Sequence, residues 1–169
     1  MKTPRLETER LILRLPSEDD TPAYVAFYAD AEASSFYGGP LGPVAAWSRM
    51  ARDVGHWHLR GYGMFSVIER ESGKMVGGCG LYWPTGWPRP ELTWWIPPEA
   101  RRKGYAHEAS RAVIDWGYDD LGWDLVETHA DDHNRAAHGL IRALGGIEIA
   151  REVFPDGVER SVFRLPKGD

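Results

Sequence analysis

Hydrophobic and polar positions follow two different periods along this chain, and the changes of period predict the order of its elements. Leu11, Leu13 and Leu15 alternate with residues that face the other way, which is typical of a strand, and Pro16 ends it. Six further runs are interpreted as strands, at residues 64–69, 75–83, 91–96, 124–130, 147–154 and 159–165. The pattern therefore predicts about seven strands.

Helices are predicted between these strands from apolar spacing and from end signals. Residues 17–20 resemble a helix cap, so one helix follows them. A second helix ends at Gly61, a third begins near Gly104, and a fourth is capped by Asp131 or Asp132. The residues that repeat at helical spacing are Val44, Trp47, Ala51, Val54 and His58 in the second helix and Ala106, Ala109, Val113 and Trp116 in the third. In the fourth, Ala137, Leu140, Ile141 and Leu144 are expected to face inward.

Turn-forming residues separate the predicted elements. Gly and Pro are frequent in residues 30–43 and 84–90, which predicts loops, and variable loops of this kind are where binding pockets form. Residues 71–74 and the Pro-Asp-Gly sequence at 155–157 are typical of hairpin turns. The chain shows no repeats and no low-complexity tract, so we expect one domain over residues 1–169.

Strand 75–83 contains an unusual number of glycines. Gly77, Gly78 and Gly80 predict a bulge or a close approach of another backbone. Cys79 lies among them and is the single cysteine of the chain, which excludes an internal disulfide. We interpret it as a buried structural cysteine, because no nearby base that would lower its pKa is visible in the sequence.

The sequence Arg101-Arg102-Lys103-Gly104-Tyr105-Ala106 lies between a predicted strand and a predicted helix. It holds the only adjacent cationic residues of the chain. A helix N-terminus carries unpaired N–H groups and a partial positive charge, so cations there are unfavourable unless an anion binds. Gly104 allows a ligand to approach the backbone. The turn therefore predicts a phosphate or pyrophosphate site, with a solvated basic turn as the alternative.

Together with the strand before it and the Pro97-Pro98 pair, this R-x-x-G-x-A motif resembles the acyl-CoA-binding motif of the GNAT N-acetyltransferases. Residues 6–14, Leu-Glu-Thr-Glu-Arg-Leu-Ile-Leu-Arg, resemble the N-terminal pattern of the ribosomal-protein N-acetyltransferase-like branch. The resemblance covers most of the chain. It implies an α/β fold of the three-layer α+β type, with a mixed, mostly antiparallel sheet of about seven strands. Strands 91–96 and 124–130 would be parallel and would splay apart.

The resemblance also implies acetyl-CoA (coenzyme A) as the cofactor. Its pantetheine would pair with backbone groups of strand 91–96, and its pyrophosphate would meet the amides of residues 102–107. An amide of Trp95 or Ile96 would contact the developing oxyanion. The expected cofactor-binding residues are Trp94, Trp95, Ile96, Arg101, Arg102, Lys103, Gly104, Tyr105, Ala106, His107 and Asn134.

For the catalytic base, the resemblance favours Glu91, acting directly or through water. The alternative is an exposed carboxylate or an ion-pair partner of Arg89 or Lys103. His56 and His58 are expected at the surface or in a pocket wall.

The position of the usual proton-donating Tyr, seven residues after Asn134, holds Ile141, which cannot donate a proton. His138, which we expect to be a packing residue, or water would then protonate the thiolate. Two further departures are Gly146, where the family usually has Phe, and Thr93, where it usually has Gly.

Composition narrows the function classes. The formal net charge is −5 and the pI is about 5.7, which disfavours broad nucleic-acid binding. The first residues lack the apolar core of a secretion signal, no run has membrane-spanning length, and no metal-binding cluster is visible, so we expect a cytoplasmic protein without metal. Eight Trp fill core or subunit contacts, which is compatible with a homodimer.

These observations predict acetyl transfer from acetyl-CoA to a primary amine without a covalent enzyme intermediate. The amine would belong to a protein N-terminus or to a small molecule. The alternative is a non-catalytic acyl-CoA-binding sensor or partner subunit. A nucleotide-binding protein is disfavoured, because neither G-x-x-x-x-G-K-[ST] nor G-x-G-x-x-G occurs in the sequence.

Overall fold

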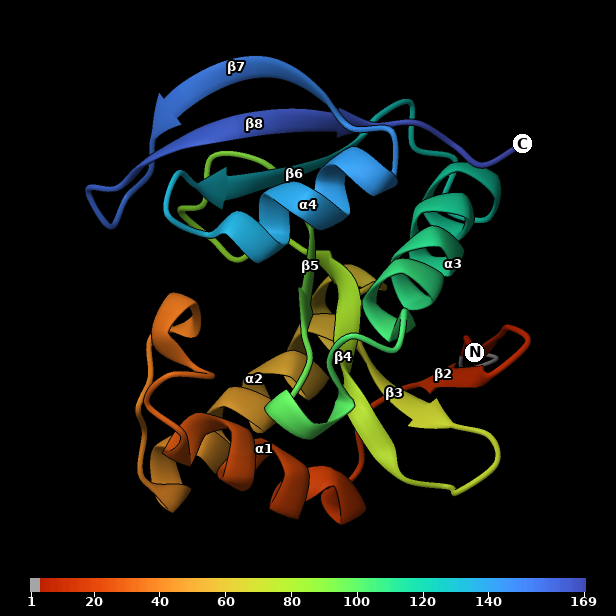
Figure 1. The fold of residues 1–169 in the computed structure, drawn as a ribbon, viewed down its shortest axis with the longest axis vertical. Coiled ribbons are helices and arrows are strands. Elements are labelled where there is room, and N and C mark those ends of the chain that lie inside the picture. Colours follow the sequence, from red (N-terminus) through yellow and green to blue (C-terminus); the bar gives the residue numbers. More distant parts are fainter. Residues whose placement is uncertain (1–3) are drawn as a thin grey trace.

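The computed structural model describes residues 4–169 and shows two sheets, which lie side by side at β5 and β6 (Figure 1). The first sheet is antiparallel, in the order β1-β2-β3-β4-β5, and the second is antiparallel in the order β6-β8-β7. Their bounds are β1 Leu6–Glu7, β2 Leu11–Arg14, β3 Met64–Glu69, β4 Met75–Tyr82, β5 Glu91–Trp95, β6 Val126–Asp131, β7 Ile147–Val153 and β8 Glu159–Leu165.

Four α-helices and three short 3-10 helices connect the strands. In Figure 1, α1 and α2 lie together on one side of the first sheet, whereas α3 lies on the other side and α4 lies against the second sheet. None of the helices described is long and apolar enough to cross a membrane. The bounds are η1 Glu18–Asp20, α1 Thr21–Ala29, η2 Ser35–Tyr37, α2 Pro43–Arg60, η3 Pro98–Ala100, α3 Tyr105–Asp119 and α4 Arg135–Ala143.

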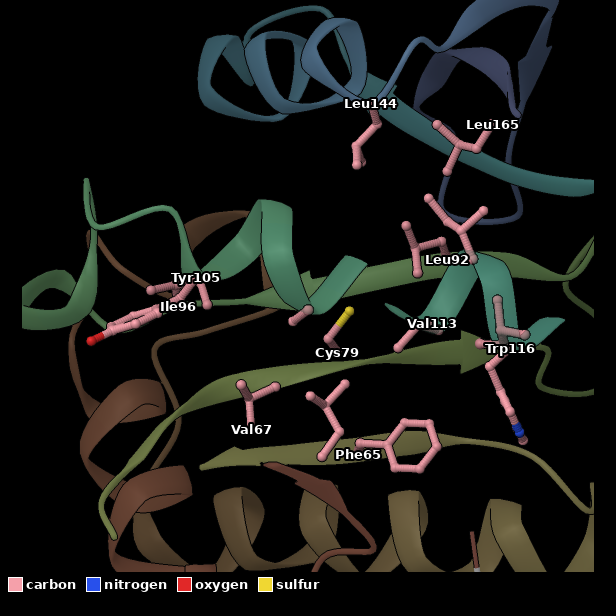
Figure 2. Packing of buried hydrophobic residues seen from close by; sticks show 14 of the residues in the cluster. Phe65, Val67, Cys79, Leu92, Ile96, Tyr105, Val113, Trp116, Leu144 and Leu165 are labelled. Atoms are coloured by element: carbon pink, nitrogen blue, oxygen red, sulfur yellow. The ribbon is translucent and has the colours of Figure 1, made fainter. Parts of the chain in front are cut away.

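The larger part of the hydrophobic core lies under α3 and α4 (Figure 2). Of the residues predicted for the apolar face of α3, Ala109 and Val113 are fully buried there, in one cluster with Phe65 and Leu81 of the first sheet, and Ala106 is partly buried. A second cluster fills the space between the α1–α2 pair and the opposite face of that sheet, where Trp95 packs. Strand β5 is therefore covered on both faces, and its position is fixed by packing.

The glycines of β4 let neighbouring groups come close, as predicted. A Cβ on Gly80 would lie 2.2 Å from the carbonyl oxygen of Gly63, and one on Gly78 would overlap the ring of Trp95 at 2.3 Å. Gly77 has a φ of 151° and lies at a bulge in β4, where Val67 pairs with Gly77 and Ile68 with Met75, so that Val76 is the extra residue. Because these positions carry no side chain, β3, β4 and β5 can approach closely and the ring of Trp95 can pack against the sheet.

The observed fold differs from the sequence prediction in three details. The strands number eight because a short strand that was not predicted, β1, precedes the first predicted strand and pairs antiparallel with it. Strands β5 and β6 lie beside each other but belong to different sheets, so the expected single sheet is divided. Asn134 caps α4 by accepting a hydrogen bond from the amide of Ala137 (3.1 Å). The prediction of Asp131 or Asp132 as the cap was wrong, because Asp131 instead accepts from the amide of His133 (2.8 Å).

Candidate active site

A cleft of about 570 Å³ opens where β5 and β6 diverge. Residues of β5, β6 and the start of α4 form its floor, and α2 with the η2 loop forms the opposite wall. Trp94, Trp95 and Asn134, which were all expected to bind cofactor, line it. The two Gly/Pro-rich loops predicted to border an acceptor pocket also contribute, through Tyr37 and Trp87 among others.

The free edge of β5 faces this cleft through alternate residues. The carbonyl of Leu92 accepts a hydrogen bond from Thr128 Oγ1 (2.8 Å), that of Trp94 from the hydroxyl of Tyr37 (2.6 Å), and that of Ile96 from Arg101 Nε (2.9 Å). These three carbonyls point away from β4, so the amides of the same residues do too. The backbone of Trp95 points the other way, toward Gly78 of β4.

Beyond the end of β5, the basic turn exposes a row of backbone donors. Arg102 has a φ of 61° and Gly104 a φ of 81°, and these left-handed residues lead into α3 at Tyr105. Within residues 4–169, no amide of residues 102–107 donates to a carbonyl or a side chain, and Gly104 provides no side-chain cap. The turn is exposed, so its N–H groups and three cations can surround an anion.

A network from the N-terminal segment holds this turn in place. Glu108 of α3 accepts hydrogen bonds from Thr8 Oγ1 (2.6 Å), from the amide of Arg10 (2.8 Å) and from Arg10 Nε (2.7 Å). Arg10 also donates to the carbonyl of Lys103 (2.8 Å) and lies over the ring of Tyr105. The segment at residues 6–14 therefore contacts the turn at residues 101–106 and the start of α3, and holds them in position.

Glu91 is buried at the start of β5, in direct contact with the imidazole of His129 on β6. Burial raises the pKa of the Glu91 carboxyl to about 8 and lowers the pKa of His129 to about 3. The indole of Trp87 donates to His129 Nε2 (3.4 Å). The Glu91–His129 pair is therefore electrically neutral near pH 7, and it lines the cleft.

The alternative interpretation of Glu91, as an exposed carboxylate or an ion-pair partner of Arg89 or Lys103, was wrong, because Glu91 is buried against His129. Arg89 binds two other carboxylates, those of Glu127 and Glu152, at 2.9 Å each. Sequence reasoning also missed His129 altogether. A signal was present, because Glu127, His129 and Asp131 alternate along a predicted strand and place polar side chains on one face.

The wall opposite β6 carries a second group of polar side chains that sequence reasoning missed. Asp53 of α2 is buried, accepts a hydrogen bond from the hydroxyl of Tyr24 (3.0 Å), and has its pKa raised to about 6 by burial. Tyr82 of β4 lies directly across the ladder from Glu91, so the two side chains share one face of the sheet. Both Asp53 and Tyr82 line the cleft.

The departures from the family pattern near α4 are connected. Ile141 is fully buried in the core and cannot act as an acid. A Cβ on Gly146 would lie 2.4 Å from Ile141 Cγ2, so the side chain at 141 fills the space that a larger residue at 146 would need. His138 shares a hydrogen bond with the carbonyl of Asp131 (3.1 Å) and packs edge-on against Phe163, outside the cleft.

The remaining reactive side chains have structural surroundings. Cys79 is fully buried, and burial raises the pKa of its thiol to about 12, as expected for a structural cysteine. His58 is exposed, as predicted. His56 is instead buried behind Tyr82, stacked on its ring, and shares hydrogen bonds with the carbonyl of Tyr62 and the amide of Trp83.

A family model described as "Acetyltransferase (GNAT) domain" matches residues 10–147. The chain belongs to this family. The prediction from the R-x-x-G-x-A motif and the N-terminal pattern is thereby confirmed, and so are the fold class and the assignment as an acyltransferase enzyme. GNAT acetyltransferases use acetyl-CoA as co-substrate.

Known GNAT proteins resemble the chain over nearly its whole length. An acetyltransferase structure from Agrobacterium tumefaciens is 29% identical, with a TM-score of 0.88, and covers 99% of this chain and 96% of its own. The N-acetyltransferase p20 of Bacillus licheniformis, named as uncharacterized, is 26% identical over 95% of this chain and 90% of its own length. A putative ribosomal-protein-serine acetyltransferase of Vibrio cholerae (20% identity, TM-score 0.79, 96% and 97% covered) shares the fold.

Proposed function

We propose that this GNAT enzyme transfers the acetyl group of acetyl-CoA to a primary amine by direct attack. The observation that carries the proposal is the edge of β5, which runs from the buried Glu91–His129 pair in the cleft toward the row of free amides beyond the end of the strand. A nucleotide-type anion site and an acid–base group at the two ends of one strand suit an acyl-CoA substrate and an acceptor. We further propose the reducing cytoplasm as its place, supported by the single buried thiol.

The residues present fit the coenzyme. The amides of residues 102–107, with Arg101, Arg102 and Lys103, would hold the pyrophosphate, and Gly104 leaves room for it. The outward amides of Trp94 and Ile96 would pair with the pantetheine arm. Asn134 lines the cleft beside this edge at the start of α4. When bound, acetyl-CoA supplies an activated acetyl thioester.

In the proposed reaction the amine nitrogen bonds to the acetyl carbon, and the C–S bond breaks. The amine proton passes to the Glu91 carboxylate, directly or through water, while His129 fixes the orientation of that carboxylate. A carboxylate with a pKa near 8 is a stronger base than an exposed one, which suits proton removal from an amine. No covalent enzyme intermediate is needed, and Cys79 is too deeply buried to form one.

Of the two amides expected to support the oxyanion, that of Ile96 is the better candidate. The backbone of Trp95 points toward β4, whereas that of Ile96 points to the cleft edge of β5. The leaving thiolate has no acid on α4, because Ile141 is buried in the core. We propose that water protonates it. In this scheme the amide of Ile96 supports the oxyanion and water protonates the thiolate, so no side chain is needed at position 141, where the family usually has Tyr.

The proposal is tested by measuring coenzyme A release with a panel of primary amines against a no-amine control. The panel contains amino acids, polyamines, peptides with free N-termini and aminoglycosides. We expect at least one amine to raise release well above hydrolysis, with the N-acetylated product identified by mass spectrometry. Tight coenzyme A binding without transfer to any amine would contradict the enzyme and favour the acyl-CoA sensor.

A further inference from the structure

Two arginines of α2 face the acceptor side of the cleft without a protein partner. Arg49 lies over the ring of Tyr28 (5.7 Å) and Arg52 over the ring of Tyr82 (5.3 Å). Within residues 4–169 neither guanidinium forms an ion pair or a side-chain hydrogen bond, although most arginines of the chain do. Stacking on an aromatic ring holds the guanidinium plane in place while its N–H donors stay free.

The charge at this wall is not balanced by the protein. On the cleft face of α2, Asp53 is the carboxylate that lies closest in sequence to the two arginines. Its attraction to both of them lowers its pKa, against the larger effect of burial. Its hydrogen bond comes from Tyr24, not from a guanidinium. Two cations against one buried carboxylate leave at least one positive charge for a ligand.

The hydroxyl of Tyr82 is a second, independent feature of the same part of the cleft. The hydroxyl of Tyr82 is buried and, in the part of the chain that the structure describes, has no hydrogen-bond partner. Its ring lies under Arg52, and its neighbour across the ladder is Glu91. An unsatisfied buried hydroxyl costs roughly 1–3 kcal/mol, so a polar group of a ligand is the natural partner.

The arginines also line a shallow hollow of about 740 Å³ at the first turns of α2, on the outer side of the cleft. A ligand whose amine reaches Glu91 can therefore extend past Tyr82 to Arg49 and Arg52. We propose that the acceptor carries a carboxylate as well as its amine, and that Arg49 and Arg52 bind this carboxylate while Tyr82 contacts the polar group between. The inference rests on the proposed acetyl transfer and names its substrate class.

The test compares acceptors with and without this carboxylate, with kcat/KM expressed per free amine because a carboxamide also lowers the pKa of the amine. Glycine, β-alanine and 4-aminobutanoate are each compared with their carboxamides, and peptides with Glu at the second position are compared with Gln peptides, all at one ionic strength. A preference within the first pairs would indicate a free amino acid as the acceptor, and a preference within the peptides would indicate an acidic N-terminal segment. We expect kcat/KM for the carboxylate to exceed that for its amide by roughly 10- to 100-fold in at least one pair.

Variants assign the preference to the two arginines. R49Q and R52Q are expected to lower the acid-to-amide ratio by roughly tenfold each. The matched control is R60Q, because Arg60 lies on the same helix over the ring of Trp83 (4.9 Å) and lines neither cavity. A second readout that needs no turnover is the thermal shift given by the N-acetylated acid against its amide.

The outcomes separate the inference from the function beneath it. Acetylation of amines with an acid-to-amide ratio near one, or a ratio that R49Q and R52Q leave unchanged, overturns the carboxylate site and leaves the acetyltransferase standing. Coenzyme A binding with no acetylation of any probe overturns both. A ratio that falls equally in R60Q also overturns the assignment, because it would reflect the general charge of α2.

Discussion

The turn that is proposed to bind coenzyme A comes from seven consecutive residues, 101–107, whereas the acceptor side of the cleft brings together side chains of four elements. Asp53 belongs to α2, Tyr82 to β4, Glu91 to β5 and His129 to β6. The turn is exposed and cationic, and its donors are backbone groups. The acceptor side is buried, and its groups are side chains whose pKa values are shifted by burial.

This difference separates binding from chemistry. A backbone turn needs only the right φ values and a bracing contact, so it can serve the same ligand with many neighbouring sequences. A buried acid–base pair depends on the packing of two sheets and two helices, so small changes in the core alter its pKa values. The four predictions below test each side separately, beginning with the largest expected effect.

G104D should remove measurable coenzyme A binding, a loss of about 1,000-fold or more, because it places a side chain and a negative charge where the pyrophosphate is proposed to bind and strains a φ of 81°. Calorimetry with coenzyme A measures it. The matched control is G122D, since Gly122 also has a positive φ (66°) and open space but lies beyond the far end of α3. Retained affinity in G104D would show that the ligand binds elsewhere.

E91Q should lower kcat by at least roughly 100-fold while coenzyme A affinity stays within about twofold, because it removes the proton acceptor but keeps the shape of the side chain. Steady-state kinetics and calorimetry measure the two quantities. E127Q is the control, because Glu127 is also a buried Glu beside the cleft but binds Arg89. An unchanged rate in E91Q would exclude Glu91 from the mechanism.

The pH dependence of kcat/KM is a second test of Glu91 on the acceptor side. Burial raises the pKa of Glu91 to about 8, so the fraction that is ionised grows as pH rises through that value. With a hydrazide acceptor, which is already neutral over the range, kcat/KM should rise roughly tenfold per pH unit below this pKa and then level off. E91Q should lose this dependence. A profile that is flat from pH 5 upward would mean that the carboxyl ionises like an exposed one.

R10A should have the smallest of these effects, a loss of roughly five- to tenfold in coenzyme A affinity with kcat at saturation unchanged. It removes the contacts that hold Lys103 and Glu108, and these are partly exposed and worth about 1 kcal/mol. The control is R5A, because Arg5 forms an exposed ion pair with Glu7 and no contact with the turn. Equal losses in R10A and R5A would contradict the bracing role.

The sequence located the basic turn before α3 but not the partner of Glu91, for a physical reason. The turn at residues 101–107 is a local feature, and its Gly, its cations and the helix after it are adjacent in the chain. Glu91 was predicted as the base through the family resemblance, and that role stays a proposal. Its partner was not predicted: the alternative considered for Glu91 paired it with Arg89 or Lys103, whereas His129 lies 38 positions away and reaches it through the packing of β5 against β6.

By itself, the sequence determined the order of the helices and of the strands after β1, the GNAT family and the position of the basic turn before α3, because periodicity, turn residues and motif spacing are local properties of a chain. Only the tertiary structure decided that residues 6–14 brace this turn, that Glu91 meets His129, and that Tyr82, Arg49 and Arg52 face one cleft. Burial and pairing of a polar side chain depend on which distant elements pack over it, and no local pattern records that.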